Sequence, residues 1–457
     1  MASSLLAQYP NDGIILYEKW VNPQWVRLLD VLQMKVRYSR CIGTELHTED
    51  GRQILDFNSG YCVHNAGHNH PKIKAAIVAE LERDGAAMLQ TGVPELAGVL
   101  GARLCERAGG RITKAFFASS GSEGVEAAIK FSRAHTGRVG MLSAKGAFHG
   151  LTCGALSLMS DEFWKDGFGP MLPEVQMVRF GALAELEARL ASKRFAAFIV
   201  EPVQVEAGMR IPDSEYLKQA QTLCRRYGTL FVLDEVQTGL HRTGPFLAAH
   251  HFGVDPDMII LAKALSGGLV PVGAVLMTDA VFNSTYSSFK RSIVHTSTYS
   301  ENALAMRAGL ATLEVLEDEG LGERATRLGQ QLRQMLAARL ADYEMVSEIR
   351  GIGMLTAIEF CAPKRLRLRI PFEAFARIHP AMFGQVVVTH MFRDQGILCQ
   401  ICGNNFLVLK VSPPLVVEEA HLEKFVSAIG QVVKLMHTSS AFWTEALGIA
   451  RRVIGSI

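Results

Sequence analysis

The stretch that decides the fold lies between residues 229 and 268, and its first part reads Leu230-Phe231-Val232-Leu233-Asp234-Glu235. A short apolar run with β-branched and aromatic members is typical of a strand that is buried on both faces. A second such run, Met258-Ile259-Ile260-Leu261-Ala262, is followed at once by Lys263. Because ligands of open α/β sheets bind outside the carboxyl ends of the strands, we expect Asp234 and Lys263 to face one binding site.

An acid and an amine at two strand ends indicate pyridoxal 5'-phosphate (PLP) as a cofactor. A lysine can hold the aldehyde of PLP as a Schiff base, and an aspartate keeps the pyridine nitrogen protonated so that the ring acts as an electron sink. Taken by itself, Lys263 also fits an ordinary lysine that reaches out from a strand end into water. The cofactor hypothesis therefore depends on the rest of the chain.

The composition is that of a globular protein of several lobes. The chain has 457 residues, of which 49% are hydrophobic and 20% charged, and its formal net charge is +2. This charge gives no reason to expect nucleic acid or an anionic membrane as a partner. No run approaches the roughly 20 apolar residues that span a bilayer, and the chain does not open on a secretory leader, so we expect a cytoplasmic protein with small-molecule partners. Cys399 and Cys402 lack the partner pair of a zinc site, and no metal site is expected.

A strand, a turn of small residues and a helix follow one another from residue 114 onward. The strand is Lys114-Ala115-Phe116-Phe117-Ala118, the turn is Ser119-Ser120-Gly121-Ser122, and the helix extends from Val125 to His135. Unpaired amides and the helix dipole make such a turn an anion site, which indicates Gly121 and Ser122 as phosphate ligands. The alternative is a plain serine cap at the start of the helix.

Buried strands and helical segments alternate through this half of the chain. Strands are expected at Val139–Leu142 and Ala196–Val200, and helices at 183–191 and 216–227. This alternation predicts an α/β fold with a mostly parallel sheet and helices on both faces. Phe148, in the turn Ala147-Phe148-His149-Gly150, has two interpretations: it stacks on a pyridine ring, or it is an ordinary core residue near a strand end.

We expect three regions: residues 1–70 as an N-terminal segment that contributes to a small domain, 71–335 as a large PLP-binding domain, and 336–457 as a C-terminal small domain. A long helical pattern from about residue 301 to 340 leads into the last region. Further elements expected outside the large domain are two short strands within 45–57, strands at 344–359, 397–400 and 406–410, and a helix at 418–436. The basic alternation from Lys364 to Arg369 is expected to be an exposed edge strand that charge protects.

Together these motifs resemble the class III aminotransferases, PLP enzymes that include the ornithine, acetylornithine and putrescine aminotransferases. The resemblance covers nearly the whole chain and implies PLP fold type I, with a mostly parallel seven-stranded sheet in the large domain and a smaller α+β domain. The motifs that carry it are Phe117-Ala118-Ser119-Ser120-Gly121-Ser122-Glu123, Phe148-His149-Gly150, Glu201-Pro202-Val203-Gln204, Leu233-Asp234-Glu235-Val236-Gln237-Thr238-Gly239, Lys263 and Ser297-Thr298.

The resemblance also implies a role for each residue of the site. Lys263 carries the Schiff base and acts as the catalytic base, and Asp234 pairs with the pyridine nitrogen. The other implied cofactor contacts are Ser120, Gly121, Ser122, Phe148, His149, Gln237 and Thr298. Because Thr298 would reach the phosphate of a neighbouring subunit, a homodimer is implied, either alone or as a dimer of dimers.

Among these enzymes the chain is most similar to ornithine aminotransferase, through Tyr61 and the segment around Glu206 among others, but two positions differ. Leu151 stands where that enzyme has an arginine that grips the α-carboxylate of the substrate. Lys410 replaces an arginine that alternates between a glutamate and the 2-oxo acid, and a lysine is not equivalent to a bidentate arginine. Lys410 is then either a weaker carboxylate clamp or the partner of Glu206. We therefore expect an amine donor without an α-carboxylate, such as a diamine, and 2-oxoglutarate or pyruvate as acceptor.

Two alternatives remain at the level of the sequence. A PLP-dependent aminomutase or epimerase on the same scaffold would need no second substrate. A non-catalytic PLP-binding protein would not need Lys263, Asp234 and Gln237 together, and their presence favours an enzyme.

Overall fold

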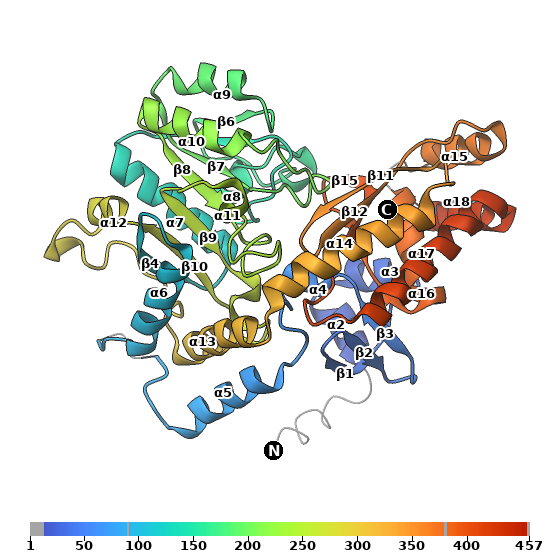
Figure 1. Ribbon diagram of the computed structural model, residues 1–457, viewed down its shortest axis with the longest axis horizontal. Helices are drawn as coiled ribbons and strands as arrows, with labels where there is room; N and C mark the ends of the chain where they lie inside the picture. The colour runs from blue at the N-terminus through green and yellow to red at the C-terminus, as the bar shows by residue number, and fades with distance from the viewer. Residues whose placement is uncertain (1–12, 89–90, 379–381, 455–457) are drawn as a thin grey trace.

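The computed structural model describes residues 13–88, 91–378 and 382–454, which form a seven-stranded sheet and two four-stranded sheets (Figure 1). The large sheet has the strand order β4-β10-β9-β8-β7-β5-β6. Its strands are β4 (Ile112–Ala118), β5 (Gly140–Ala144), β6 (Val175–Val178), β7 (Phe195–Val200), β8 (Leu230–Asp234), β9 (Met258–Leu261) and β10 (Gly273–Thr278). Strands β6, β5, β7, β8 and β9 are parallel to one another, and β10 is antiparallel to β9 and β4. The predicted mostly parallel sheet is confirmed.

Helices cover both faces of this sheet, because alternate residues of its strands point to opposite sides. On one face, Val232 of β8 belongs to the same apolar cluster as Phe131 of α7 (Gly121–Thr136). On the other face, Phe231 clusters with Leu217 of α10 (Tyr216–Tyr227). The remaining helices of this part include α5 (Pro71–Glu82), α6 (Glu95–Ala108), α8 (Cys153–Ser157), α9 (Leu183–Leu190), α11 (Ala249–Phe252) and α12 (Asp279–Thr285). Both faces of the sheet are therefore buried, which explains why its strands are continuous apolar runs.

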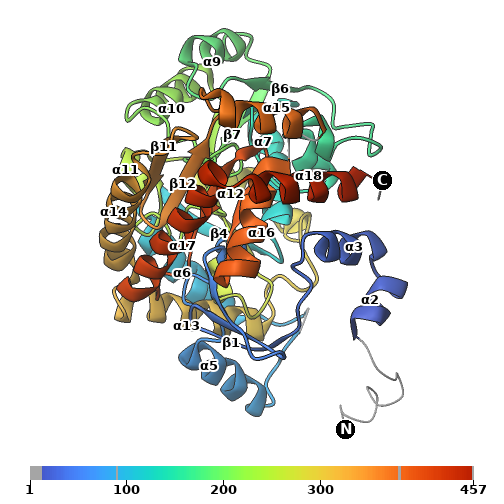
Figure 2. The same ribbon diagram turned by 90° about the vertical axis from the view of Figure 1, so that its right-hand side faces the viewer.

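The two smaller sheets join the two ends of the chain. The first has the order β1-β2-β3-β13, and β13 (Ile397–Leu398) is parallel to β3. Its N-terminal strands are β1 (Tyr38–Ile42), β2 (Glu45–Thr48) and β3 (Gln53–Asp56), preceded by α2 (Gly13–Trp20) and α3 (Pro23–Val31). The second sheet is antiparallel and contains β11 (Val346–Ile352), β12 (Leu355–Phe360), β15 (Asn405–Val411) and β14 (Gln400–Cys402). Figure 2 shows α16 (Phe383–Gln395), α17 (Glu419–Thr438) and α18 (Ser440–Ile454) beside these sheets.

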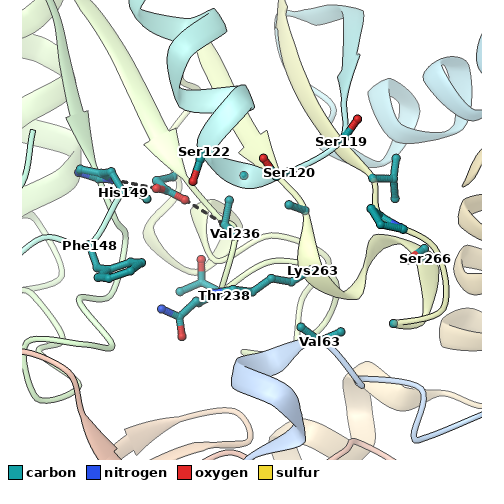
Figure 3. A pocket seen from close by; sticks show the side chains of 18 of the residues that line it. Val63, Ser119, Ser120, Ser122, Phe148, His149, Val236, Thr238, Lys263 and Ser266 are labelled. Atoms are coloured by element: carbon teal, nitrogen blue, oxygen red, sulfur yellow. Dashed lines mark hydrogen bonds and ion pairs between the residues drawn. The ribbon is translucent and has the colours of Figure 1, made fainter. Parts of the chain in front are cut away.

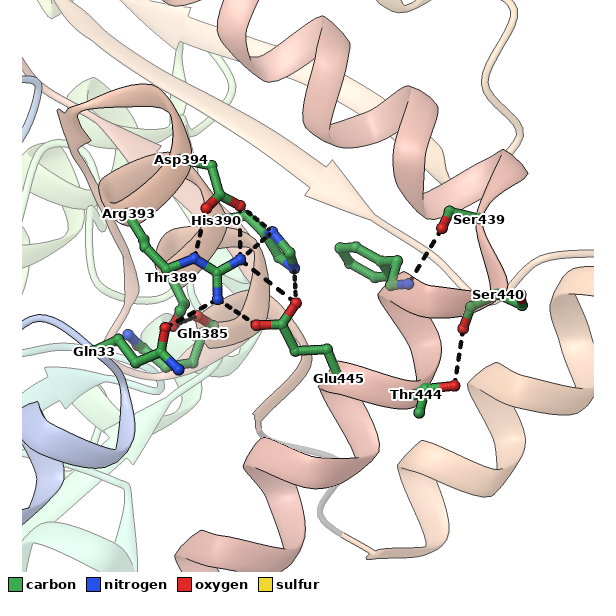
Figure 4. A network of polar contacts seen from close by, with 11 residues as sticks. Gln33, Gln385, Thr389, His390, Arg393, Asp394, Ser439, Ser440, Thr444 and Glu445 are labelled. Carbon is green, nitrogen blue, oxygen red and sulfur yellow. Dashed lines mark hydrogen bonds and ion pairs between the residues drawn. The ribbon is translucent and has the colours of Figure 1, made fainter.

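A polar network ties the last helix to this lobe (Figure 4). Arg393 of α16 donates to Glu445 of α18, to Asp394 and, over 3.0 Å, to Gln33 after α3. His390 stacks on Phe442 at a ring distance of 4.9 Å. The network therefore connects three segments that are far apart in sequence.

The structure differs from two sequence predictions outside the large sheet. The long pattern from 301 to 340 forms two helices, α13 (Ala303–Asp318) and α14 (Leu321–Leu340), which are separated where Gly320 takes a left-handed φ of 59°. The predicted edge strand at 364–369 is wrong, because α15 (Leu366–Ile378) occupies most of it. Leu368 and Phe375 are both buried, seven residues apart on one helix face, and this longer repeat outweighs the short alternation of charges. No helix among the described residues is both long and apolar enough to cross a membrane.

Candidate functional site

A cavity of about 550 Å³ lies at the carboxyl ends of β7, β8 and β9 and at the start of α7 (Figure 3). Its lining includes Ser119 to Ser122, Phe148 to Gly150, Glu201, Asp234, Val236 to Thr238 and Lys263. The parallel order β7-β8-β9 brings three of these strand ends together. The structure thus collects most of the residues that the sequence singled out for the cofactor.

Lys263 is separated from β9 by Ala262 alone and begins a single 3₁₀ turn. Its φ of 48° lies in the left-handed region, which is uncommon for a lysine and is typical of residues that a surrounding structure constrains. Gly268, with φ of 80°, follows closely, and a Cβ there would come within 2.5 Å of the ring of His64. Burial lowers the pKa of Lys263. Within the described part of the chain its amine makes no hydrogen bond or ion pair. The lowered pKa favours the uncharged amine, which is the form that reacts with an aldehyde.

Asp234 ends β8 and is held from two sides. His149 Nδ1 lies 2.8 Å from its Oδ2, and the backbone N–H of Val236 donates to its Oδ1 over 3.1 Å. Both side chains are buried, and His149 Nε2 has no partner among the described residues. The carboxylate is therefore fixed in orientation at the base of the cavity.

Beside the cavity, Lys410 of β15 forms a buried ion pair with Glu206. Its Nζ donates to Glu206 Oε1 over 2.5 Å, and Gln237 Nε2 donates to the same oxygen over 3.2 Å. Burial opposes the charge on both groups, but the partner's charge outweighs it, so the pKa of Lys410 is raised and that of Glu206 is lowered. The ammonium of Lys410 also lies 4.7 Å from the ring centre of Tyr61. Lys410 was predicted to be either a carboxylate clamp or the partner of Glu206, and in the structure it is paired with Glu206.

A left-handed turn presents Tyr61. Residues 59 to 62 (α4, Ser59–Cys62) all have positive φ, between 44° and 69°. Arg242 stabilises the turn because its buried guanidinium donates to Ser59 Oγ over 3.1 Å, to Asn65 and to the carbonyl of Pro413. Arg242 is thus engaged in holding the backbone, and the sequence gives no local signal for this role.

The start of α7 is a serine cap that also leaves amides available for an anion. Ser120 Oγ accepts the N–H of Glu123 over 3.2 Å, as a plain cap does. The amides of Gly121 and Ser122, the first two of the helix, have no acceptor within the helix. A Cβ at Gly121 would lie 3.0 Å from Val236, so glycine lets another part of the site approach. The two interpretations are compatible.

Five predicted site residues are not part of this lining: Tyr61, Leu151, Glu206, Thr298 and Lys410. Leu151 is 54% exposed and follows Gly150, which does line the cavity. Thr298 borders a second hollow of about 950 Å³, together with Tyr286, Phe289 and His295. Glu201, by contrast, lines the cavity although no role followed for it from the sequence. The signal was present, because Glu201 follows an apolar strand in the same way as Asp234 does.

The residues present fit PLP. The free amine of Lys263 suits its aldehyde, the fixed carboxylate of Asp234 suits a protonated pyridine nitrogen, and the unpaired amides of α7 suit its phosphate. Gln237 Oε1 is buried without a partner in the described residues, and so is open to a bound group.

Comparison with known proteins agrees with this geometry. The family model "Aminotransferase class-III" matches residues 29–433. The chain is 33% identical to aminotransferase PigE of Serratia over 95% of its own length and 55% of that protein, so it spans about half of PigE. It is 37% identical to a putrescine aminotransferase of Pectobacterium atrosepticum over 78% of this chain and 76% of that protein.

Solved structures give the same result. The ornithine aminotransferase of Toxoplasma gondii ME49 matches with a TM-score of 0.81 and 27% identity over 95% of this chain and 98% of that chain. A PLP-bound amine transaminase from an uncultivated Pseudomonas species matches with a TM-score of 0.78 and 28% identity over 88% and 95% of the two chains.

Proposed function

The chain belongs to the class III aminotransferase family, whose cofactor is PLP, and from this membership we propose that it is a transaminase for terminal amines. The donor is a diamine or another ω-amine without an α-carboxylate, and the acceptor is a 2-oxo acid such as 2-oxoglutarate or pyruvate. When bound, PLP supplies the electron sink for charge that develops on the amine-bearing carbon of the donor.

Each residue of the cavity has a task in this proposal. Lys263 holds the cofactor through its amine and, once the donor amine displaces it, moves the proton from the amine-bearing carbon. Asp234 keeps the pyridine nitrogen protonated, and its contact with His149 supports this by fixing the carboxylate. Phe148 stacks on the ring, and Gln237 links the ring side of the cavity to Glu206.

At the phosphate end, Ser120, Gly121 and Ser122 hold the anion through the first turn of α7. Thr298 of a second subunit completes this end in a homodimer. The placement of Thr298 beside a separate hollow, where Phe289 is almost fully exposed, supports a contribution from one subunit to the other.

One observation supports a donor without an α-carboxylate. Among the described residues that line the cavity, His149 and Lys263 are the only basic side chains, and both have other tasks. Leu151 offers no charge, and Lys410 is occupied by Glu206. An α-carboxylate would lose water without a guanidinium to replace it, which costs of order 1 to 3 kcal/mol.

The Glu206–Lys410 pair serves the acceptor half of the reaction. When the pair opens, Lys410 is free to bind the carboxylate of the 2-oxo acid. The ring of Tyr61 remains in contact with the ammonium of Lys410. When the pair forms again, the charges of Lys410 and Glu206 cancel, and this side of the cavity can accept an uncharged part of the donor. A lysine makes this clamp weaker than an arginine would.

A panel of amines, each with pyruvate and with 2-oxoglutarate, tests the proposal. We expect carbonyl product and amino acid in equal amounts, and only when both substrates are present. Product from the amine alone would point to an aminomutase or epimerase. No change in the cofactor absorption on adding any amine would point to a non-catalytic PLP-binding protein.

A further inference from the structure

Glu201 is a buried acid for which the proposed reaction has so far no use. It follows β7, lines the cavity and is only 5% exposed. Its Oε1 accepts the backbone N–H of Phe148 over 3.4 Å. Its Oε2 is buried and has no hydrogen-bond partner among the described residues. A buried carboxylate oxygen without a partner is costly, so this atom needs an explanation.

The charges around Glu201 are already balanced without it. Among the described residues, the acids whose charges act on it are Asp234 on β8 and Glu206 in the loop after β7, and Lys263 is the cation that acts in the opposite direction. Asp234 is bonded to His149, and Glu206 is paired with Lys410. Lys263 is needed as an uncharged amine in order to react. An ionised Glu201 would therefore be a third negative charge with no counter-ion of its own.

The energetic balance favours the protonated form. Burial raises the pKa of Glu201 well above its ordinary value, and the negative charges of Asp234 and Glu206 raise it further. The amide of Phe148 and the amine of Lys263 act in the opposite direction but do not offset these effects. A neutral acid also has a hydrogen atom to donate, which a carboxylate does not.

We propose that Glu201 is a positioning residue that stands in the cavity as a neutral carboxylic acid, with the O–H of Oε2 donating a hydrogen bond to the bound pyridoxal ring. This inference rests on the proposed function for the identity of the ring. The acceptor would be an oxygen of the ring, since the amides at the start of α7 would hold the phosphate. The bond would stabilise negative charge on that oxygen, and the neutral form of Glu201 adds no further negative charge beside Asp234 and Glu206.

Glu201→Gln and Glu201→Leu separate this role from that of an ordinary buried acid. Glutamine keeps an oxygen for the amide of Phe148 and a donor for the cavity, whereas leucine keeps neither. We expect Glu201→Gln to bind PLP within about threefold of wild type, with the same pH dependence of the cofactor absorption. Glu201→Leu is expected to bind about tenfold more weakly, the equivalent of one lost hydrogen bond. The pH at which the cofactor absorption changes should differ between Glu201→Leu and wild type.

The apoprotein gives a second readout that needs neither cofactor nor turnover. An acid that is neutral in the folded state and ionised in the unfolded state stabilises the fold at low pH, and this contribution is lost as the pH rises. Between about pH 5 and pH 8, the thermal midpoint of wild type should therefore fall relative to that of Glu201→Gln. Glu206→Gln is the matched control, since it removes an ionised partner of Lys410 and should lower the midpoint throughout.

The inference is wrong if Glu201→Gln fails to fold, because a neutral side chain of the same shape should be tolerated. It is equally wrong if the midpoints of wild type and Glu201→Gln stay parallel, or if Glu201→Gln loses PLP affinity as Glu201→Leu does. An absence of transamination in wild type, with these three results intact, would contradict the proposed function alone.

Discussion

The ammonium of Lys410 lies 2.5 Å from Oε1 of Glu206, and both side chains are buried where β15 meets the loop after β7. This pair joins the small antiparallel sheet to the edge of the cofactor cavity. Removal of one partner from a buried pair leaves an unpaired charge and destabilises a protein by roughly 3 to 5 kcal/mol, whereas replacement of both partners is often far less costly. The pair can therefore be dissected into its structural and its functional contribution.

We predict that Lys410→Met raises the KM for the 2-oxo acid about tenfold, and more than the KM for the amine, because the acceptor carboxylate loses its cation. Steady-state kinetics with both substrates varied measures this. The double variant Lys410→Met/Glu206→Gln is the control, since it should recover thermal stability without recovering acceptor KM. An acceptor KM that Lys410→Met leaves unchanged would mean that another residue binds the carboxylate.

Donor preference follows from Leu151. Wild type should use putrescine or cadaverine with a kcat/KM roughly tenfold to a hundredfold above that for L-ornithine, because the α-carboxylate of ornithine finds no guanidinium. Leu151→Arg should shift the preference toward ornithine, whereas Leu151→Met, of similar size and no charge, should not. A wild type that prefers ornithine would contradict the substrate proposal.

Asp234→Asn should lower kcat by at least about a hundredfold and leave the fold intact, because a neutral amide no longer favours a protonated pyridine nitrogen. Rapid kinetics of the amine half-reaction and a thermal melt together measure both effects. Retention of most of the activity would remove Asp234 from the role given to it here.

Acid should destabilise the protein through His64. Burial lowers the pKa of His64 to about 4, and the neighbouring His68, stacked on it at 3.8 Å, acts in the same direction. The unfolded state therefore binds a proton more readily than the folded state, and stability falls as the pH decreases from the unperturbed value of 6.5 toward 4. Melting curves across this range should show a steeper loss in wild type than in His64→Gln, and identical slopes would contradict the burial of a neutral imidazole.

Much of the fold could be predicted because its signals are local. Continuous apolar strands such as Leu230–Asp234 and helices such as Tyr216–Tyr227 lie close to where the sequence placed them. The stretch from Lys364 to Arg369 could not be assigned from six residues, since its alternation fits a strand while the buried residue that completes the helical pattern, Phe375, lies further on. The division of the chain at residues 70 and 335 and a cytoplasmic location stay predictions.

The site was predictable where it depends on strand ends and not where it depends on long-range contacts. Asp234 and Lys263 meet in one cavity because β8 and β9 are neighbours in a parallel sheet. The left-handed turn at residues 59–62, by contrast, depends on Arg242, which is far away in sequence. Likewise, the sequence does not show that Oε2 of Glu201 has no partner or that Asp234 and Glu206 lie near it, because both facts depend on the folded structure.

The central claim is that Lys263 holds the cofactor, and borohydride reduction followed by peptide mapping tests it most directly. Reduction of the yellow holoprotein fixes an aldehyde that is bound to a lysine as a stable secondary amine. We predict that the pyridoxyl group is found on the peptide that contains Lys263, and that Lys263→Ala gives no labelled peptide and no transamination. A label on a different lysine, or transamination near the wild-type rate in Lys263→Ala, would contradict the account.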